Sequence, residues 1–85
     1  MEVIFLPDAD DDLQFWISAG NKVIIKKIVQ LIDDIKVHPY TGLGKPEPLK
    51  HILSGAWSRR INKEHRLIYE MDGEKILILS ARGHY

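Results

Sequence analysis

The sequence predicts an α+β fold in which an N-terminal strand and a two-helix antiparallel hairpin precede an antiparallel β-meander. Three observations predict it: a helical apolar stripe covers residues 24–35, three β-rich runs follow residue 56, and an Asp-Gly turn signal separates the last two runs. In this order of elements the helices cover one face of the sheet and leave the other face open.

The first half of the chain supplies the strand and the helices. An apolar run over residues 3–6 ends at a proline and suits a strand, and Asp8 can cap a helix whose first turn is acidic. A second helix follows residues 19–21 and ends at His38-Pro39, because the residue before a proline disfavours helical geometry. Its apolar stripe consists of Ile24, Ile25, Ile28, Leu31, Ile32 and Ile35. The short joining segment predicts that the two helices run antiparallel.

The second half supplies strands at residues 57–61, 65–71 and 75–81. A two-residue loop at Asp72-Gly73 would set Glu70 opposite Lys75, and a three-residue loop at 62–64 would set Arg60 opposite Arg66. One face then carries the residues expected to pack on the helices: Trp57, Ile61, Leu67, Tyr69, Met71, Ile76 and Ile78. The other face carries Ser58, Arg60, Arg66 and Ile68.

Composition bounds the class of protein. The chain has 85 residues, 12 Lys+Arg, 12 Asp+Glu and no cysteine. This length suits one domain over residues 1–85, and the missing cysteines exclude disulfides, thiolate metal clusters and a Cys nucleophile. The N-terminus lacks a basic start, and no apolar run is long enough to span a membrane, so a cytoplasmic location is expected.

The zero net charge conceals two halves of opposite sign. Residues 1–34 hold three lysines against seven acidic residues, a net charge of −4, and the remainder is therefore +4. The basic side chains gather between residues 45 and 66. This local patch leaves nucleic-acid binding open, although bulk positive charge is absent.

The expected pair of Arg60 and Arg66 is the first candidate site. Like charges opposite each other in a sheet are destabilising unless a carboxylate or an anionic ligand compensates. Two solvated arginines, or a register off by one residue, would explain the pair equally well. The third interpretation is a site that binds phosphate.

Glu47 and His84 are the second pair of candidates. Prolines on both sides restrict the backbone of Glu47, which sits among basic residues. A stiff loop whose glutamate forms a surface ion pair would explain this segment equally well without any function. His84 lies on a short tail after the last strand, and Gly83 would permit the bend that brings it to Arg66. A terminal histidine alone is more often inert.

Together these residues form a chemically complete set for cutting RNA without a metal. The reaction needs a base for the 2′-OH proton, cations for the charge on phosphorus and an acid for the 5′ oxygen. Glu47, the two arginines and His84 supply them, and DNA lacks the internal nucleophile. The four histidines show no zinc-site spacing, and residues 41–45 lack the spacing of a phosphate-binding P-loop.

Several ordered blocks also resemble a known family. They are Gly44-Lys45-Pro46-Glu47-Pro48-Leu49-Lys50-His51, Leu53-Ser54-Gly55, Trp57-Ser58-Arg59-Arg60-Ile61, Glu64-His65-Arg66-Leu67-Ile68-Tyr69 and His84-Tyr85. Together they resemble the Txe/YoeB branch of the RelE-type toxins over nearly the whole chain. The resemblance implies a toxin of a bacterial type II toxin-antitoxin module that uses no metal or cofactor and cuts mRNA in the ribosomal A site.

The resemblance also implies a role for each site residue. Glu47 is the expected general base, His84 the general acid and Arg66 the stabiliser of the transition state. The expected phosphate and substrate contacts are Lys50, Arg60, Tyr85, Arg59 and His51. Expected partners are a YefM/Axe-like antitoxin with an acidic C-terminal segment, the ribosome with its mRNA, and a second copy of the chain joined through the helical half.

Two other functions stay open on the sequence alone. The chain could be a non-catalytic, ParE-like inhibitor of a protein target, in which Glu47 and His84 are dispensable. It could also bind nucleic acid without turnover. If it is a nuclease, the absence of a global positive field predicts weak action on free RNA and dependence on the ribosome.

Overall fold

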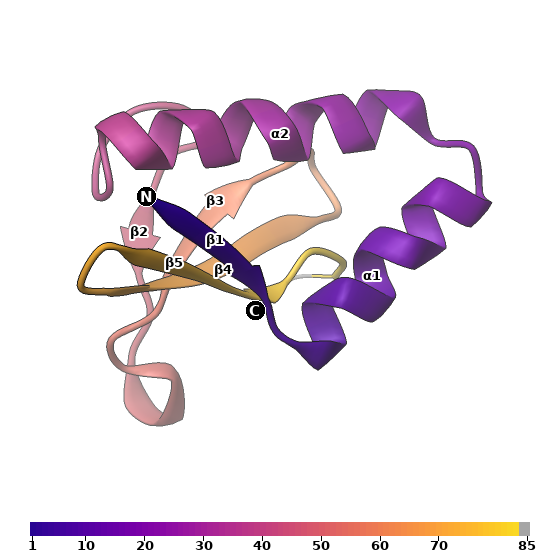
Figure 1. The fold of residues 1–85 in the computed structure, drawn as a ribbon. Helices are drawn as coiled ribbons and strands as arrows, with labels where there is room; N and C mark the ends of the chain where they lie inside the picture. Colours follow the sequence, from indigo (N-terminus) through magenta and orange to yellow (C-terminus); the bar gives the residue numbers. More distant parts are fainter. Residues whose placement is uncertain (84–85) are drawn as a thin grey trace.

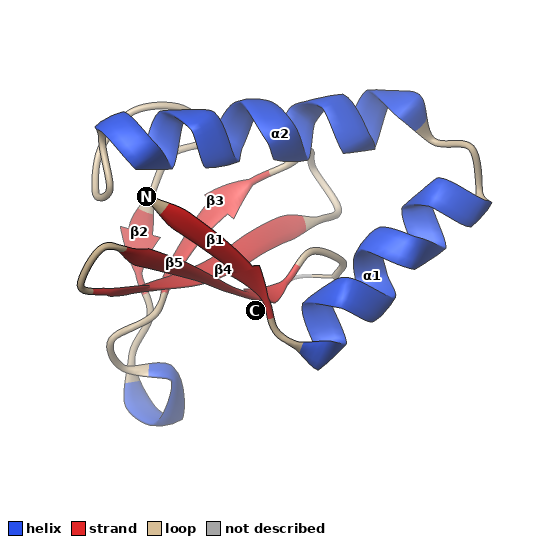
Figure 2. Cartoon of the chain, in the orientation of Figure 1, coloured by secondary structure: helices blue, strands red, loops and turns tan. Residues whose placement is uncertain are grey.

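The computed structural model describes residues 1–83, apart from the side chain of Ile52. The elements in chain order are β1 (Glu2–Phe5), α1 (Pro7–Ser18), α2 (Lys22–Val37), β2 (Glu47–Pro48), the short 3-10 helix η1 (His51–Leu53), β3 (Trp57–Arg60), β4 (Arg66–Asp72) and β5 (Lys75–Ser80). The strands form one sheet in the order β1-β5-β4-β3-β2. Figure 1 and Figure 2 show α2 lying along the sheet and α1 beside the end of β5. The predicted α+β class is confirmed.

The sheet is mixed, because β1 adds to the meander in the parallel direction. β1 pairs with β5, setting Val3 beside Ile76 and Phe5 beside Ile78, whereas β3, β4 and β5 are antiparallel to their neighbours. β2 is a two-residue edge strand that pairs with β3 and was not predicted as a strand. Pro48 is tolerated there because an edge strand has one row of backbone groups without a strand partner.

The helices begin and end where local chemistry allows. Pro7 occupies the first position of α1, and the N-cap is Leu6 without a side-chain hydrogen bond, so the prediction that Asp8 caps this helix is wrong. Proline suits this position because its missing N–H would have no partner in the helix. Asn21 caps α2 by accepting a hydrogen bond from the Ile24 amide at 3.1 Å, and the helix ends before His38, as predicted.

One of the two predicted hairpin registers is correct. Arg60 faces Arg66 across β3 and β4, as predicted. Between β4 and β5 the prediction is wrong, because Asp72 pairs with Lys75 and the turn residues are Gly73 and Glu74. Gly73 has φ 60°, so the glycine is used at the first turn position, where a positive φ is required. A shift of two residues keeps Tyr69, Ile76 and Ile78 on their predicted face, and an irregularity between Ile68 and Tyr69 then pairs Ile68 with Ser80.

The core lies between the helices and the predicted apolar face of the sheet. Its buried members are Ala9, Trp16, Ile24, Ile28, Leu31, Ile32, Ile35, Ile61, Leu67, Tyr69, Ile76, Ile78 and Ala81. The opposite face is less open than predicted, since Ser58 and Ile68 are almost fully buried there. The segment 49–56 passes near this face: Leu53 lines a pocket with Leu79. Among the described residues, no helix has the length and apolar character needed to cross a membrane.

Candidate active site

Glu47 and Arg66 meet on the sheet face that points away from the helices. The Nη1 of Arg66 donates a hydrogen bond to Glu47 Oε1 at 3.2 Å and another to Ser58 Oγ at 3.0 Å. The pairing explains this meeting, because Glu47 lies opposite Ser58 on β3 and Arg66 starts β4, the next strand. The Glu47 side chain is 58% exposed and that of Arg66 only 19%. The carboxylate of Glu47 thus faces solvent while it contacts the partly enclosed guanidinium of Arg66.

The loop before Glu47 is packed tightly onto β3. The Gly44 carbonyl accepts a hydrogen bond from the Arg60 amide at 2.7 Å. Gly44 has φ 78°, and a Cβ there would lie 2.9 Å from Leu31 Cδ2 and 3.0 Å from the Arg60 carbonyl oxygen, so this close approach requires a glycine. Lys45 follows with φ 51°, a conformation uncommon for a residue with a side chain. The fold therefore fixes the entry of the chain into β2.

Arg60 and Arg66 face each other, but their surroundings differ. Glu47 compensates the charge of Arg66, whereas Arg60 is exposed and forms no ion pair within residues 1–83. The off-register explanation is excluded, and simple solvation fits Arg60 but not the partly enclosed Arg66. Two guanidinium groups and one carboxylate on the same face form a site that an anion could enter.

Lys50 lies on the loop that leaves β2 and His51 begins η1, and both residues are exposed. Within the described part of the chain, neither side chain forms a hydrogen bond or ion pair with Glu47 or Arg66. His51 has φ 61°, again in the left-handed region. Their role in substrate binding stays a prediction.

His84 and Tyr85 lie outside the described residues. The chain can be followed to Gly83, whose carbonyl accepts a hydrogen bond from the Arg66 amide at 2.8 Å. Gly83 has φ 81°, the bend for which a glycine is needed. The residue that precedes His84 is thus bonded to the backbone of Arg66. Among residues 1–83, no three His, Asp or Glu side chains gather as a metal site would require.

The sequence is similar to that of a known protein family. The model of the YoeB-like toxin of bacterial type II toxin-antitoxin system matches residues 5–85. The chain belongs to this family. Toxin YoeB of Escherichia coli is 48% identical over 85 residues, which are all of both chains, and Toxin RelK of Mycobacterium tuberculosis is 48% identical over 83 residues, 98% of this chain and 96% of that one.

Solved structures of the family share the fold. A YoeB/ParE toxin from Agrobacterium tumefaciens superposes with a TM-score of 0.93 at 39% identity, covering all of both chains. A chain of a YoeB-YefM complex from Staphylococcus aureus gives 0.90 at 42% identity over 100% of this chain and 98% of that one, and the YoeB dimer from the same species gives 0.91 at 41% with the same coverage. The protein is therefore a YoeB-like toxin of a type II toxin-antitoxin system.

Within this family fold, Arg59 is not part of the phosphate site, and the prediction for it is wrong. Its side chain is fully buried on the helix side of the sheet, and all five of its N–H groups donate within the fold. Its Nε donates to Tyr69 Oη at 3.1 Å. Its Nη1 donates to Asp34 Oδ2 at 2.6 Å and to the Leu43 carbonyl at 3.1 Å. Its Nη2 donates to the Thr41 carbonyl at 2.8 Å and to the His38 carbonyl.

Arg59 perturbs the groups that surround it. Its hydrogen bond lowers the pKa of Asp34, and the backbone amide of Leu43 adds to this effect. Burial raises the pKa of Tyr69, and the nearby guanidinium opposes that rise. The Tyr69 hydroxyl also donates to the Pro39 carbonyl at 2.7 Å. The toxin thus uses Arg59 to hold the 38–43 loop, which leads into β2 and Glu47.

Two features of the toxin escaped sequence reasoning. Ser58 was placed on the correct face but not identified as a partner of Arg66, because a lone serine in a strand has no distinguishing signal. The burial of Arg59 did have a signal. Side chains alternate along a strand, so Arg59 shares a face with the core residues Trp57 and Ile61 on either side of it.

Proposed function

We propose that this toxin is a metal-independent endoribonuclease that cuts mRNA on the ribosome. The observation that carries the proposal is the contact between Glu47 and Arg66 on the accessible sheet face, with Gly83 bonded to the backbone of Arg66 and His84 next in the chain. A base, a cation and an acid are the groups that cleavage through the 2′-OH requires.

The proposed reaction is an internal displacement at phosphorus. Glu47 takes the 2′-OH proton as the 2′ oxygen bonds to phosphorus, and His84 gives a proton to the departing 5′ oxygen. The products are a 2′,3′-cyclic phosphate and a free 5′-OH, so no water molecule or cofactor is consumed. The two proton transfers leave the total charge of the site unchanged.

Arg66 is suited to stabilise the charge that develops on phosphorus. Its Nη1 serves Glu47 and Ser58, whereas its Nε and Nη2 form no hydrogen bonds within residues 1–83. These unused donors can reach an entering phosphate in a bidentate manner, which arginine allows and lysine does not. Arg60 and Lys50, both exposed, would hold neighbouring phosphates.

The charge balance supports dependence on the ribosome. The formal net charge is zero, and Arg59 adds no positive charge to the surface because it is buried in an ion pair with Asp34. Little positive field remains to concentrate free RNA at the site. We propose that the ribosome presents the mRNA and that the protein acts in the bacterial cytoplasm.

The proposed binding partner is an antitoxin. The similar toxin from Staphylococcus aureus has been solved in a YoeB-YefM complex and as a dimer. An acidic antitoxin segment that folds on binding would neutralise Arg60 and Lys50 and cover Glu47. A second copy of the chain is the alternative partner, and co-purification with the neighbouring small reading frame separates the two.

The deciding experiment is cleavage mapping on translating ribosomes. Wild-type protein is expected to create new mRNA 5′ ends carrying hydroxyl groups, and Glu47→Ala and His84→Ala are expected to reduce them to a small residual level. Glu74→Ala, which removes a carboxylate from the exposed turn after β4, is the matched control and should cut normally. Equal cutting by His84→Ala would contradict the proposal. Growth arrest by the double variant Glu47→Ala, His84→Gln would instead support the non-catalytic inhibitor.

A further inference from the structure

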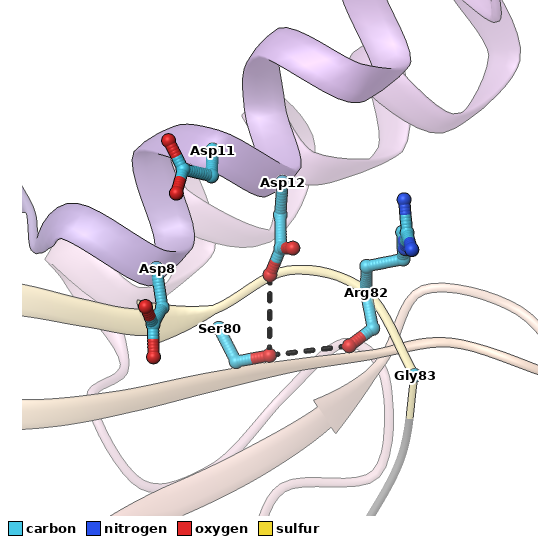
Figure 3. Close-up of a pocket in the computed structure, with 6 residues that line it drawn as sticks. All are labelled: Asp8, Asp11, Asp12, Ser80, Arg82 and Gly83. Atoms are coloured by element: carbon cyan, nitrogen blue, oxygen red, sulfur yellow. Dashed lines mark hydrogen bonds between the residues drawn. The ribbon is translucent and has the colours of Figure 1, made fainter.

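The segment after β5 is bonded to α1 and to the start of β4 along its backbone. The Ala81 amide donates to Asp12 Oδ2 at 2.9 Å, and Trp16 Nε1 donates to the Ala81 carbonyl at 2.9 Å. Figure 3 shows Asp12 reaching from α1 toward Ser80, whose hydroxyl lies 3.4 Å from the same carboxylate oxygen. Residues 80 and 81 are therefore fastened to the first helix.

His65 forms a hydrogen bond with Gly83, the last described residue. Its Nδ1 accepts a hydrogen bond from the Gly83 amide at 2.9 Å, while the neighbouring Arg66 amide donates to the Gly83 carbonyl at 2.8 Å. Both backbone groups of Gly83 are thus held by two consecutive residues of the β3–β4 connection and β4. Because Nδ1 accepts here, the hydrogen bond assigns the neutral imidazole with its proton on Nε2.

The orientation of the His65 ring is itself fixed. The ring packs edge-on against Trp16, with centroids 4.8 Å apart and planes at 75°. The backbone amide of His65 donates to Asn62 Oδ1 at 2.8 Å, which shapes the turn before β4. Trp16 therefore has two contacts with this region, one through its N–H to Ala81 and one through its ring to His65.

We propose that His65 is a positioning residue for RNA cleavage, which fixes Gly83 so that His84 is delivered to the phosphate beside Arg66. This inference rests on the proposed function, in which His84 is the acid. The Cα atoms of consecutive residues are about 3.8 Å apart, so fixing both backbone groups of Gly83 fixes the point from which His84 extends. A glycine without such anchors has the widest backbone freedom, and misplacement by about 1 Å can cost a hundredfold in rate.

The test uses two substitutions that separate the acceptor from the ring. His65→Phe keeps an aromatic ring against Trp16 but removes the acceptor, and His65→Asn keeps an acceptor oxygen near the place of Nδ1 but removes the ring. In single-turnover cleavage on programmed ribosomes, His65→Phe should lower kcat by about tenfold to a hundredfold with KM nearly unchanged. His65→Asn should restore much of the rate. Equal rates for wild type and His65→Phe, or an equal loss in both variants, would overturn the inference.

A second measurement does not depend on cleavage. Amide hydrogen exchange at Gly83 should be faster in His65→Phe than in wild type, because the phenylalanine variant lacks the acceptor. In His65→Asn, which keeps an acceptor, the exchange should be slower than in His65→Phe. Unchanged exchange in His65→Phe would overturn the anchor itself.

A double-variant cycle distinguishes failure of this inference from failure of the proposed function. If His65 acts through His84, then His65→Phe should have no further effect on the residual cutting by His84→Ala. A multiplied loss in the double variant would show that His65 acts in another way, which contradicts the inference. If wild type and His84→Ala cut equally, the proposed acid is wrong, and the hydrogen exchange result still decides whether His65 anchors Gly83.

Discussion

Two guanidinium groups on opposite faces of the sheet show how one side chain can serve structure or chemistry. Arg59 lies on the helix face, fully buried, with all five N–H groups bonded inside the protein. Arg66 starts the neighbouring strand on the other face, where among residues 1–83 only its Nη1 forms hydrogen bonds and its partner carboxylate is 58% exposed.

The difference lies in how many donors the fold uses. A buried charge is tolerated only when it is paired and fully hydrogen-bonded, which describes Arg59. Arg66 is enclosed enough to be held in place but retains donors that a ligand can use, which is the property of a binding site. Substitution of the buried Arg59 is therefore expected to lower mainly the stability, and substitution of Arg66 in the open site is expected to lower mainly the activity.

Arg59→Met is expected to have the largest effect and would test the buried side of the comparison. It leaves Asp34 and several carbonyls without their donor, so the free energy of unfolding should fall by about 3–5 kcal/mol, a large part of the stability of a small domain. Urea unfolding measures this change. Arg60→Met, one residue away on the exposed face, is the control and should stay within about 0.5 kcal/mol of wild type. Equal stabilities for the two variants would remove the distinction between the faces.

Arg66→Ala tests the open side. The cleavage rate should fall about 10²- to 10³-fold, because a donor to the developing charge on phosphorus is lost. Stability should change by only about 1 kcal/mol, since the Glu47 carboxylate that pairs with Arg66 is 58% exposed and solvent weakens the ion pair. Single-turnover cleavage and urea unfolding give the two numbers. A large loss of stability with normal cutting would make Arg66 a structural residue like Arg59.

Acid titration tests the buried site, because Asp34 is the ion-pair partner of Arg59. The hydrogen bond from Arg59 lowers the pKa of Asp34 in the folded protein below the ordinary value of 3.8. Its ionised form therefore stabilises the fold above about pH 4, and this contribution is lost as the pH falls through the lowered folded pKa. Asp34→Asn should be less stable at pH 7 and should lose less stability between pH 5 and pH 3. Parallel stability curves for the two proteins in that interval would show that the pair does not couple to folding.

Arg60→Ala should have the smallest effect, confined to substrate binding. On a single-stranded RNA with 2′-deoxy substitutions that block cutting, the slope of log Kd against log salt should fall by about 0.7, as expected for one lost phosphate contact. Filter binding at several salt concentrations measures this slope. An unchanged slope would mean that Arg60 is only a solvated surface residue.

The parts of the fold that depend on local rules could be predicted from the sequence. The apolar stripe of α2 and the short loop before β4 define a helix and a register, so the meeting of Arg60 and Arg66 could be predicted. The parallel pairing of β1 with β5 joins segments far apart in the chain, for which a four-residue apolar run carries no signal.

The candidate site was predictable to the same degree. The two prolines indicated that Glu47 is held rigidly, but the pairing of β2 with β3, which sets Glu47 beside Arg66, was not predicted. The acceptors around Arg59 are mostly backbone carbonyls of the 38–43 loop, which any sequence would supply, so the residue was assigned to the basic surface. The hydrogen bond from Gly83 to His65 depends on the path of the chain after β5, which propensities do not describe.

The pairing of β1 with β5 also determines when the toxin can become active during its own synthesis. The strand made first lies against the strand made last, with Ile4 beside Leu77, and α1 holds Ala81. Contacts between residues so far apart in sequence form late in folding. We therefore expect that a nascent chain still on its ribosome carries no assembled site until β5 has been made and has paired with β1.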